Sequence, residues 1–154
     1  MKKLLLLLII PFLSFGQENI EPKITGIGGV FFKSENPIEL KNWYTKNLGI
    51  NTDEYGYMFL SRNIDHPEKI NYLQWSPFNK NTNYFNPSTK DFMINYTVQN
   101  IEGLVENLKK DGVMVLDTIE KYEYGKFVHI LDSEGNKIEL WEPPRNQDSI
   151  NFGE

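Results

Sequence analysis

A strand, a capped helix and further strands occur twice along the chain, and this repeat restricts the fold more than any other feature. Asn36 and Asn100 are each suited to cap a helix, because an Asn side chain can accept a hydrogen bond from the first turn. Gly49 and Gly112 follow the two helices as residues that tolerate a left-handed backbone. The repetition predicts two similar modules that bury their apolar faces against each other.

The first module spans residues 24–77 and the second residues 91–143, within one domain of residues 24–144. Residues 78–89 predict a long loop or linker, and residues 145–154 a C-terminal tail. The expected strands are 24–33, 57–61, 70–76, 92–98, 113–116, 127–131 and 137–142. The fold class is α+β: two βαβββ modules forming one curved mixed sheet, with the helices on the convex side and a ligand pocket on the concave side.

Alternation along the strands sorts the side chains onto two faces of the sheet. The apolar set falls consistently on the face that the helices would cover: Val30, Phe32, Leu73, Trp75, Ile94, Tyr96, Val98, Val128, Ile130, Ile138 and Leu140. The concave face receives Gly29, Phe31, Gln74, Met93, Asn95, His129, Glu139 and Trp141. The first helix is expected to bury Leu40, Trp43, Tyr44 and Leu48. Three glycines within residues 24–33 predict a bulge or the close approach of another backbone or a ligand.

Two neighbouring strands within residues 125–143 bring an acid beside a histidine. Glu139 and His129 share the concave face, so they could form a ligand site. The alternative for Glu139 is a structural carboxylate, hydrogen-bonded to Asn95 or Gln74. The alternative for His129 is a strand histidine that donates one hydrogen bond to a neighbour.

A signal peptide is predicted at residues 1–16. Two lysines precede an apolar run, and Ser14 and Gly16 place small residues before a cut at Gln17. The run is shorter than the ~20 residues that a spanning helix needs, and an uncleaved anchor is the alternative. We therefore expect a periplasmic or secreted protein in which residues 17–23 form a linker.

Charge and cysteine content narrow the partners. The chain has no cysteine, which excludes disulfides, thiol catalysis, thiolate metal sites and a lipid-anchored lipoprotein. Its net charge of −5 argues against nucleic acid or an anionic membrane surface, because basic patches bind both. The expected partner is a small organic ligand, with no nucleic acid and no membrane contact after signal cleavage.

The run from Asp132 to Leu140 (DSEGNKIEL), at the end of paired modules, resembles the vicinal oxygen chelate superfamily. This superfamily includes glyoxalase I, bleomycin-resistance proteins and extradiol dioxygenases. The runs GGVFFK, WYTKNLG and MINYTV are also similar to glyoxalase-like members, and the resemblance covers Ile24 to Pro143. It implies modules that pair within one chain or swap between two, and a homodimer is one expected arrangement.

The resemblance also implies a divalent metal, held by one residue on each of four strands and acting as a Lewis acid. Two of the four positions match Glu139 and Gln74. The other two fall on Gly29, which has no side chain, and on Met93. His129 could replace one lost ligand. The full tetrad is absent, so a divalent metal cofactor is doubtful.

Two functions remain open. In the first, an exported protein binds a small organic molecule through the concave-face residues Phe31, Gln74, Met93, Asn95, His129, Glu139 and Trp141. In the second, a metal-dependent lyase or isomerase of glyoxalase type uses Glu139 as general base or metal ligand and His129 as acid. Lactoylglutathione lyase activity itself is not expected, because its anionic substrate would meet an acidic pocket.

Overall fold

The computed structural model describes residues 20–144, so the predicted signal peptide and the C-terminal tail lie outside the described residues. The helices are α1 (Pro37–Leu48) and α2 (Ile101–Lys110). The strands are β1 (Lys23–Ser34), β2 (Tyr57–Arg62), β3 (Ile70–Asn79), β4 (Phe92–Gln99), β5 (Met114–Val115), β6 (Glu120–Tyr122), β7 (Gly125–Leu131) and β8 (Lys137–Glu142). In the described part, neither helix has the length and apolar character to cross a membrane.

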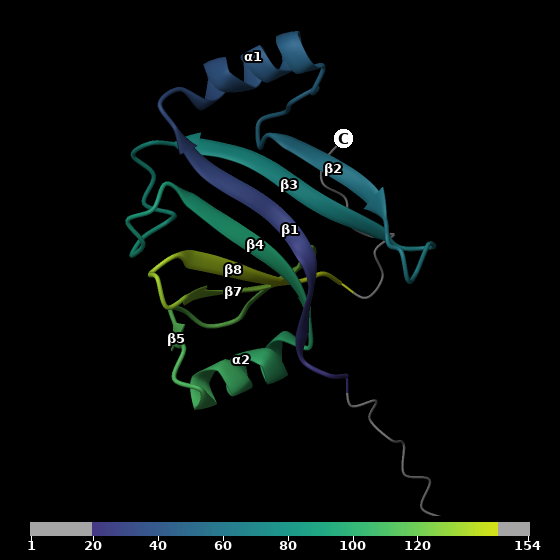
Figure 1. The fold of residues 1–154 in the computed structure, drawn as a ribbon, viewed down its shortest axis with the longest axis vertical. Coiled ribbons are helices and arrows are strands. Elements are labelled where there is room, and N and C mark those ends of the chain that lie inside the picture. Colours follow the sequence, from purple (N-terminus) through teal and green to yellow (C-terminus); the bar gives the residue numbers. More distant parts are fainter. Residues whose placement is uncertain (1–19, 145–154) are drawn as a thin grey trace, which may run out of the picture.

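One mixed sheet in the order β2-β3-β1-β4-β8-β7-β5 runs through both modules (Figure 1). Strand β6 pairs with β7 beside this path. The first strands of the modules, β1 and β4, lie antiparallel, and each runs parallel to its other neighbour, β3 or β8. The predicted α+β class and curved mixed sheet are confirmed. The strands divide unequally, since β2 and β3 follow α1 whereas β5 to β8 follow α2.

The second module packs tightly around α2. The Asn100 side chain caps the helix by accepting a hydrogen bond from the Gly103 N–H at 3.1 Å. The Asn100 N–H in turn donates to the Glu142 carboxylate at 2.8 Å, which ties the helix start to the end of β8. The core beneath α2 is formed by Val98, Ile101, Val105, Val128, Ile130 and Leu140. The apolar face predicted for this half of the sheet is therefore the face that α2 covers.

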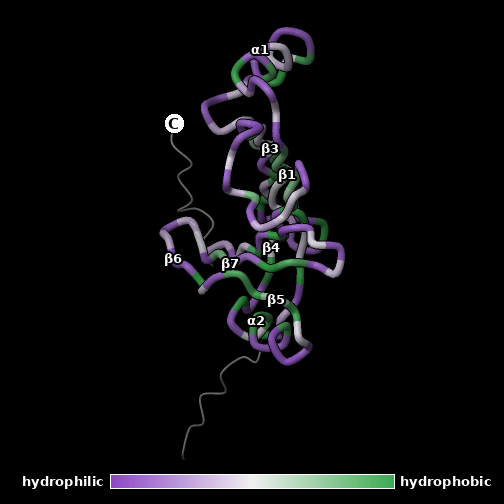
Figure 2. The backbone as a smooth tube through the Cα atoms, turned by 90° about the vertical axis from the view of Figure 1, so that its left-hand side faces the viewer, coloured by the Kyte–Doolittle hydropathy of each residue, from purple (hydrophilic) through white to green (hydrophobic). Residues whose placement is uncertain are grey.

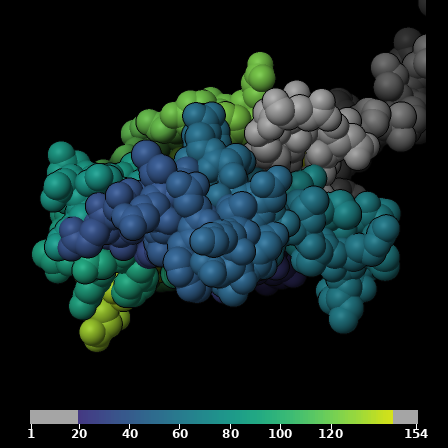
Figure 3. Space-filling model, turned by 90° about the horizontal axis from the view of Figure 1, so that it is seen from above, coloured from purple at the N-terminus to yellow at the C-terminus, as the bar shows by residue number. Residues whose placement is uncertain are grey.

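Helix α1 forms as predicted but buries little. Asn36 caps it and Gly49 ends it in a left-handed conformation, yet none of its residues is buried. Tyr44 packs against Trp75 of β3, with ring centroids 4.6 Å apart. Helix α1 lies at one end of the elongated molecule and α2 lies at the other end (Figure 2). The outer surface of α1 is visible in the view from above (Figure 3).

The prediction that Trp43 and Leu48 belong to the core was wrong. Trp43 is 52% exposed and Leu48 is 57% exposed. Their spacing is helical, but α1 reaches the sheet chiefly through β3 and β1, near one edge. A helix at an edge covers less of the sheet, so only part of its apolar stripe finds a partner.

The chain between β3 and β4 folds across the concave face, which is the face of the sheet away from α2. Strand β3 continues as far as Asn79, and the residues after it form the predicted loop. Phe85 in this loop is completely buried and packs with Phe31 and Met93, and Phe78 packs against the three of them. The loop is therefore part of the core and not a loose linker, because Phe85 of the loop and Phe78 at the end of β3 cover apolar surface that would otherwise face water.

Candidate functional site

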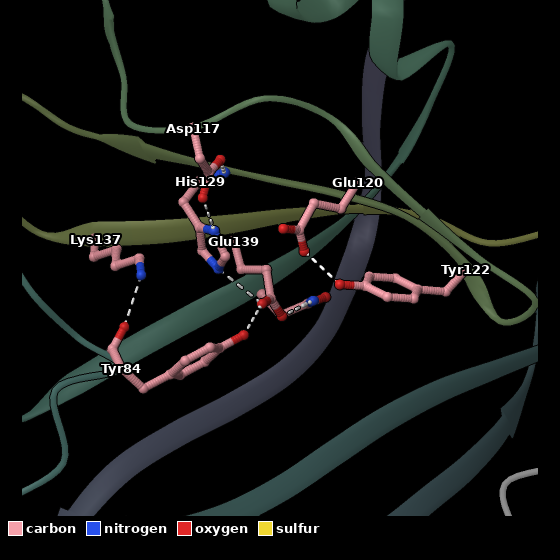
Figure 4. Close-up of polar contacts among 8 residues, drawn as sticks. Tyr84, Asp117, Glu120, Tyr122, His129, Lys137 and Glu139 are labelled. Carbon is pink, nitrogen blue, oxygen red and sulfur yellow. Dashed lines mark hydrogen bonds and ion pairs between the residues drawn. The ribbon is translucent and has the colours of Figure 1, made fainter.

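Glu139 lies at the centre of a buried polar cluster on the concave face (Figure 4). Strand register places it directly between Asn95 of β4 and His129 of β7, and it is only 4% exposed. Its Oε1 accepts a hydrogen bond from Asn95 Nδ2 at 2.7 Å, and its Oε2 lies 2.9 Å from His129 Nε2. Oε2 also accepts a hydrogen bond from the Tyr84 hydroxyl. Three side chains thus converge on one carboxylate.

Asp117 extends the cluster toward the surface. It lies between β5 and β6, and its Oδ2 is 2.6 Å from His129 Nδ1. Its other oxygen accepts the His129 backbone N–H at 2.8 Å. His129 therefore stands between two carboxylates, with one ring nitrogen facing Asp117 and the other facing Glu139. The position of Asp117 had no signal in the sequence, because it depends on how the β5–β6 connection folds back.

These contacts set the protonation states. Burial alone would raise the pKa of Glu139, but the hydrogen bonds that it accepts, from His129 first, hold the pKa below its ordinary value. Burial would lower the pKa of His129, yet its hydrogen bonds to Glu139 and Asp117 raise it above the ordinary value. The pKa of Tyr84 is raised by burial and then by the nearby Glu139 charge. Both shifts favour an ion pair between His129 and Glu139, with the neutral phenol of Tyr84 as third partner.

Tyr84 reaches the cluster from the loop between β3 and β4, unlike the other donors. Its ring stacks on Phe78, with centroids 5.4 Å apart and planes 1° apart, and meets His129 edge-on. Lys137, which is buried on β8, donates from its ammonium group to the Tyr84 carbonyl at 2.7 Å. The same ammonium group lies 4.9 Å from the centre of the Tyr84 ring. Tyr84 and Lys137 were not among the predicted site residues, although alternation places Lys137 on the same face as Glu139.

The glycines of β1 make room for this cluster. A Cβ atom at Gly28 would lie 2.3 Å from Asn95 Oδ1 and 2.9 Å from the Trp141 ring. The register of β1 against β4 also shifts between Ile27 and Gly29. The Gly-rich strand thus contains the predicted bulge, and the groups that come close to it are the Asn95 and Trp141 side chains instead of a backbone or a ligand.

Phe31, Met93 and Gln74 do not reach the Glu139 carboxylate. Phe31 and Met93 are buried and pack with Phe85, so the loop covers this part of the predicted pocket. Gln74 lies on β3, which is separated from β8 by β1 and β4, and its side chain donates to Ser76 Oγ at 3.1 Å.

Trp141 lies beside the cluster and belongs to an aromatic group. It is buried, its ring N–H donates to the Tyr124 carbonyl at 2.9 Å, and it stacks on Phe127. Trp141 also lines a groove of about 910 Å³ that runs between the β2–β3 hairpin and the ends of β4 and β8. Glu139 and His129 do not line this groove.

The donor set does not fit the divalent metal that the resemblance implies. Among residues 20–144, no three His, Asp or Glu side chains are grouped so that they could hold a metal ion. Both ring nitrogens of His129 already face carboxylates, and both oxygens of Glu139 already accept hydrogen bonds. Gly29 offers no donor, and the Met93 thioether is buried among aromatic rings.

The chain was compared with known proteins. No family model and no curated protein matches its sequence. A methylmalonyl-CoA epimerase in complex with methylmalonyl-CoA and NH4+ is 12% identical with a TM-score of 0.57, over 80% of this chain and 97% of that one. The Streptomyces coelicolor epimerase in complex with 2-nitronate-propionyl-CoA is 13% identical with a TM-score of 0.56, over 79% and 99%. The Mycobacterium tuberculosis epimerase is 17% identical with a TM-score of 0.53, over 81% and 92%.

At these identities the likeness is one of fold. The single mixed sheet through both modules, the helix-covered face and the concave face opposite are the features that the repeat predicted. The chain has the vicinal oxygen chelate fold.

Proposed function

We propose that this is an exported protein that binds a small organic molecule on the concave face, at the Glu139 cluster, without a metal ion. The proposal rests on a difference between the three residues that donate hydrogen bonds to Glu139: two lie on strands and one lies on a loop. Asn95 and His129 come from strands and are held by sheet register. Tyr84 comes from a loop and is 40% exposed, so a ligand can take its place without disturbing the sheet.

The geometry favours binding over catalysis. A general base next to a carbonyl works best with a pKa near the working pH. The pKa of Glu139 is instead held below its ordinary value, and its charge is already balanced by His129. The carboxylate is therefore suited to accept hydrogen bonds from a ligand and poorly suited to remove a proton from one.

The structural relatives support a small organic ligand in a general way. Two of the epimerase structures with this fold hold methylmalonyl-CoA or 2-nitronate-propionyl-CoA. Residues 20–144 contain no group of His, Asp and Glu side chains that could serve as a metal tetrad, so we assign recognition to Glu139, His129 and the aromatic walls around them.

The test is a ligand screen on the purified mature protein, combined with elemental analysis. We expect compounds that raise the melting temperature of the wild type and lose this effect in Glu139→Gln. Glu134→Gln, in the exposed turn before β8, is the matched control and should keep the effect. Stoichiometric metal that is lost in Glu139→Ala would overturn the metal-free site, and stabilisation that survives in Glu139→Gln would place the ligand elsewhere.

Export is supported by the N-terminal pattern of two lysines, an apolar run and small residues before Gln17. N-terminal sequencing of the protein recovered outside the cytoplasm should begin at Gln17. Recovery of the full-length chain in a membrane fraction would contradict cleavage and favour the uncleaved anchor.

A further inference from the structure

The ring of Tyr84 occupies a space on the concave face whose surroundings suit a phenol, and we call this space the seat. We propose that the ligand of the concave face is a hydroxyaromatic molecule, whose ring and hydroxyl take the place of the Tyr84 side chain. The inference rests on the proposed function and deepens it, because it names the class of ligand that the Glu139 cluster would recognise.

Every side of the seat matches a phenol. The ring face rests on Phe78 in a parallel stack, and the ring edge meets His129 at 90°. The ammonium group of Lys137 lies over the ring, where the negative face of the π-system attracts a cation. At the far end the Tyr84 hydroxyl donates a hydrogen bond to Glu139. These four contacts recognise a flat ring and one polar position on it; Figure 4 shows Tyr84 with His129, Lys137 and Glu139.

Tyr84 can leave this seat while the loop stays in place. The neighbouring Phe85 is completely buried, and Ser88 is 5% exposed, so the loop is anchored beside Tyr84 and not by it. The Ser88 N–H donates to the Phe85 carbonyl at 3.0 Å, and Lys137 holds the Tyr84 carbonyl. A rotation of the Tyr84 side chain toward solvent would therefore uncover the seat without unfolding the loop.

The ligand needs a hydroxyl group to replace the one that the displaced Tyr84 side chain takes away from Glu139. Without it, Glu139 Oε2 keeps only His129 as partner in a largely buried position. A ring that lacks a donor would cover this oxygen and leave it short of a hydrogen bond, which costs free energy. An anionic ring such as a benzoate would meet the carboxylates of Glu139, Asp117 and the nearby Glu120, so a neutral phenol is preferred.

The experiment uses Tyr84→Ala in the full mature chain, with phenol as probe and anisole as the matched ring without a donor. We expect phenol to bind Tyr84→Ala about tenfold or more tightly than anisole, in proportion to one hydrogen bond to a charged group. The wild type should bind phenol more weakly than the variant, because its own tyrosine competes. Tyr124→Ala removes a partly exposed tyrosine elsewhere on the molecule and should not gain phenol binding.

Three results would overturn the proposal. Equal binding of phenol and anisole would show that the hydroxyl group is not recognised. Phenol binding that survives in Tyr84→Ala/Glu139→Gln would show that Glu139 is not the acceptor of the hydroxyl group. If Tyr84→Ala is folded by circular dichroism and still binds no phenol, the space left by Tyr84 is not a phenol site. If other compounds then stabilise the wild type in a Glu139-dependent way, the proposed function stands and the ligand class falls. If no compound does, both fall.

Discussion

The two helices have the same start and stop signals in the sequence, but they lie in different surroundings in the folded protein. Both begin at a capping Asn and end beside a glycine. Helix α2 buries Ile101 and Val105 in a core shared with three strands, whereas no residue of α1 is buried. The difference teaches that caps and periodicity determine where a helix forms, while its place over the sheet determines how much it stabilises the fold.

The same contrast separates the parts of the candidate site. Asn95, Asp117, His129 and Glu139 all belong to the second module, next to the tight core. The connection after the first module supplies Tyr84 and the aromatic wall around it. The fixed half of the site thus lies on the stable module, and its removable cover comes from the loop. Four predictions follow from this division, the largest effect first.

Truncating the second core should cost the most. Leu140→Ala removes a side chain that is 1% exposed, and we expect a loss of about 3 kcal/mol in the free energy of unfolding. Leu48→Ala in α1 is the matched change at an exposed leucine and should cost under about 0.5 kcal/mol. Urea denaturation measures both. Equal losses would mean that α1 is as firmly packed as α2.

Removing the charge of Glu139 should come next. Glu139→Gln leaves the volume unchanged but takes the ionic partner from His129, and we expect a loss of about 2 kcal/mol. Glu134→Gln, which changes an exposed turn residue, should leave stability within about 0.5 kcal/mol. If the two variants unfold at the same urea concentration, the buried ion pair contributes nothing to the second module.

The pH dependence of stability should follow the same pair. The pKa of His129 is raised on folding, so its stabilising contribution is complete below its ordinary value of 6.5 and is lost as pH rises through the folded value. The pKa of Glu139 is lowered, so its contribution is present above its ordinary value of 4.5 and is lost as pH falls through the folded value. The advantage of the wild type over His129→Gln in urea should therefore shrink as pH rises above 6.5. An advantage that grows over this range would contradict the charged histidine.

The smallest effect is expected in α1. Trp43→Ala should change the free energy of unfolding by less than about 0.5 kcal/mol, because more than half of the side chain is exposed. Tyr44→Ala, which loses the contact with Trp75, should cost more. Denaturation at two protein concentrations provides the check. A loss for Trp43→Ala that appears only at the higher concentration would reveal a homodimer that covers α1.

Part of the site follows from local pattern. Alternation alone placed Glu139, His129 and Asn95 on one face, because side-chain direction in a strand depends only on position. The apolar face under α2 follows for the same reason. The register that puts these three in one row comes from the pairing of β4 with β8 and of β8 with β7, which the tertiary structure supplies.

Tyr84 and Asp117 could not be found in this way. Each lies in a segment without helix or strand, where no period tells which way a side chain points. Tyr84 reaches Glu139 across 55 positions of sequence, because Phe85 beside it is drawn into the concave core. The exposure of Trp43 and Leu48 likewise depends on how far α1 lies from the centre of the sheet.

The sequence by itself determined the two helices, the strands other than β6, the two faces of the sheet and the residue at the centre of the site. Those features depend on local backbone preference and on the period of the side chains, which are properties of short stretches. Only the tertiary structure decided that the loop covers the concave face, that His129 lies between two carboxylates and that Tyr84 sits where we place a ligand. Those features depend on contacts between distant segments, whose free energy exists only once the sheet has brought them together.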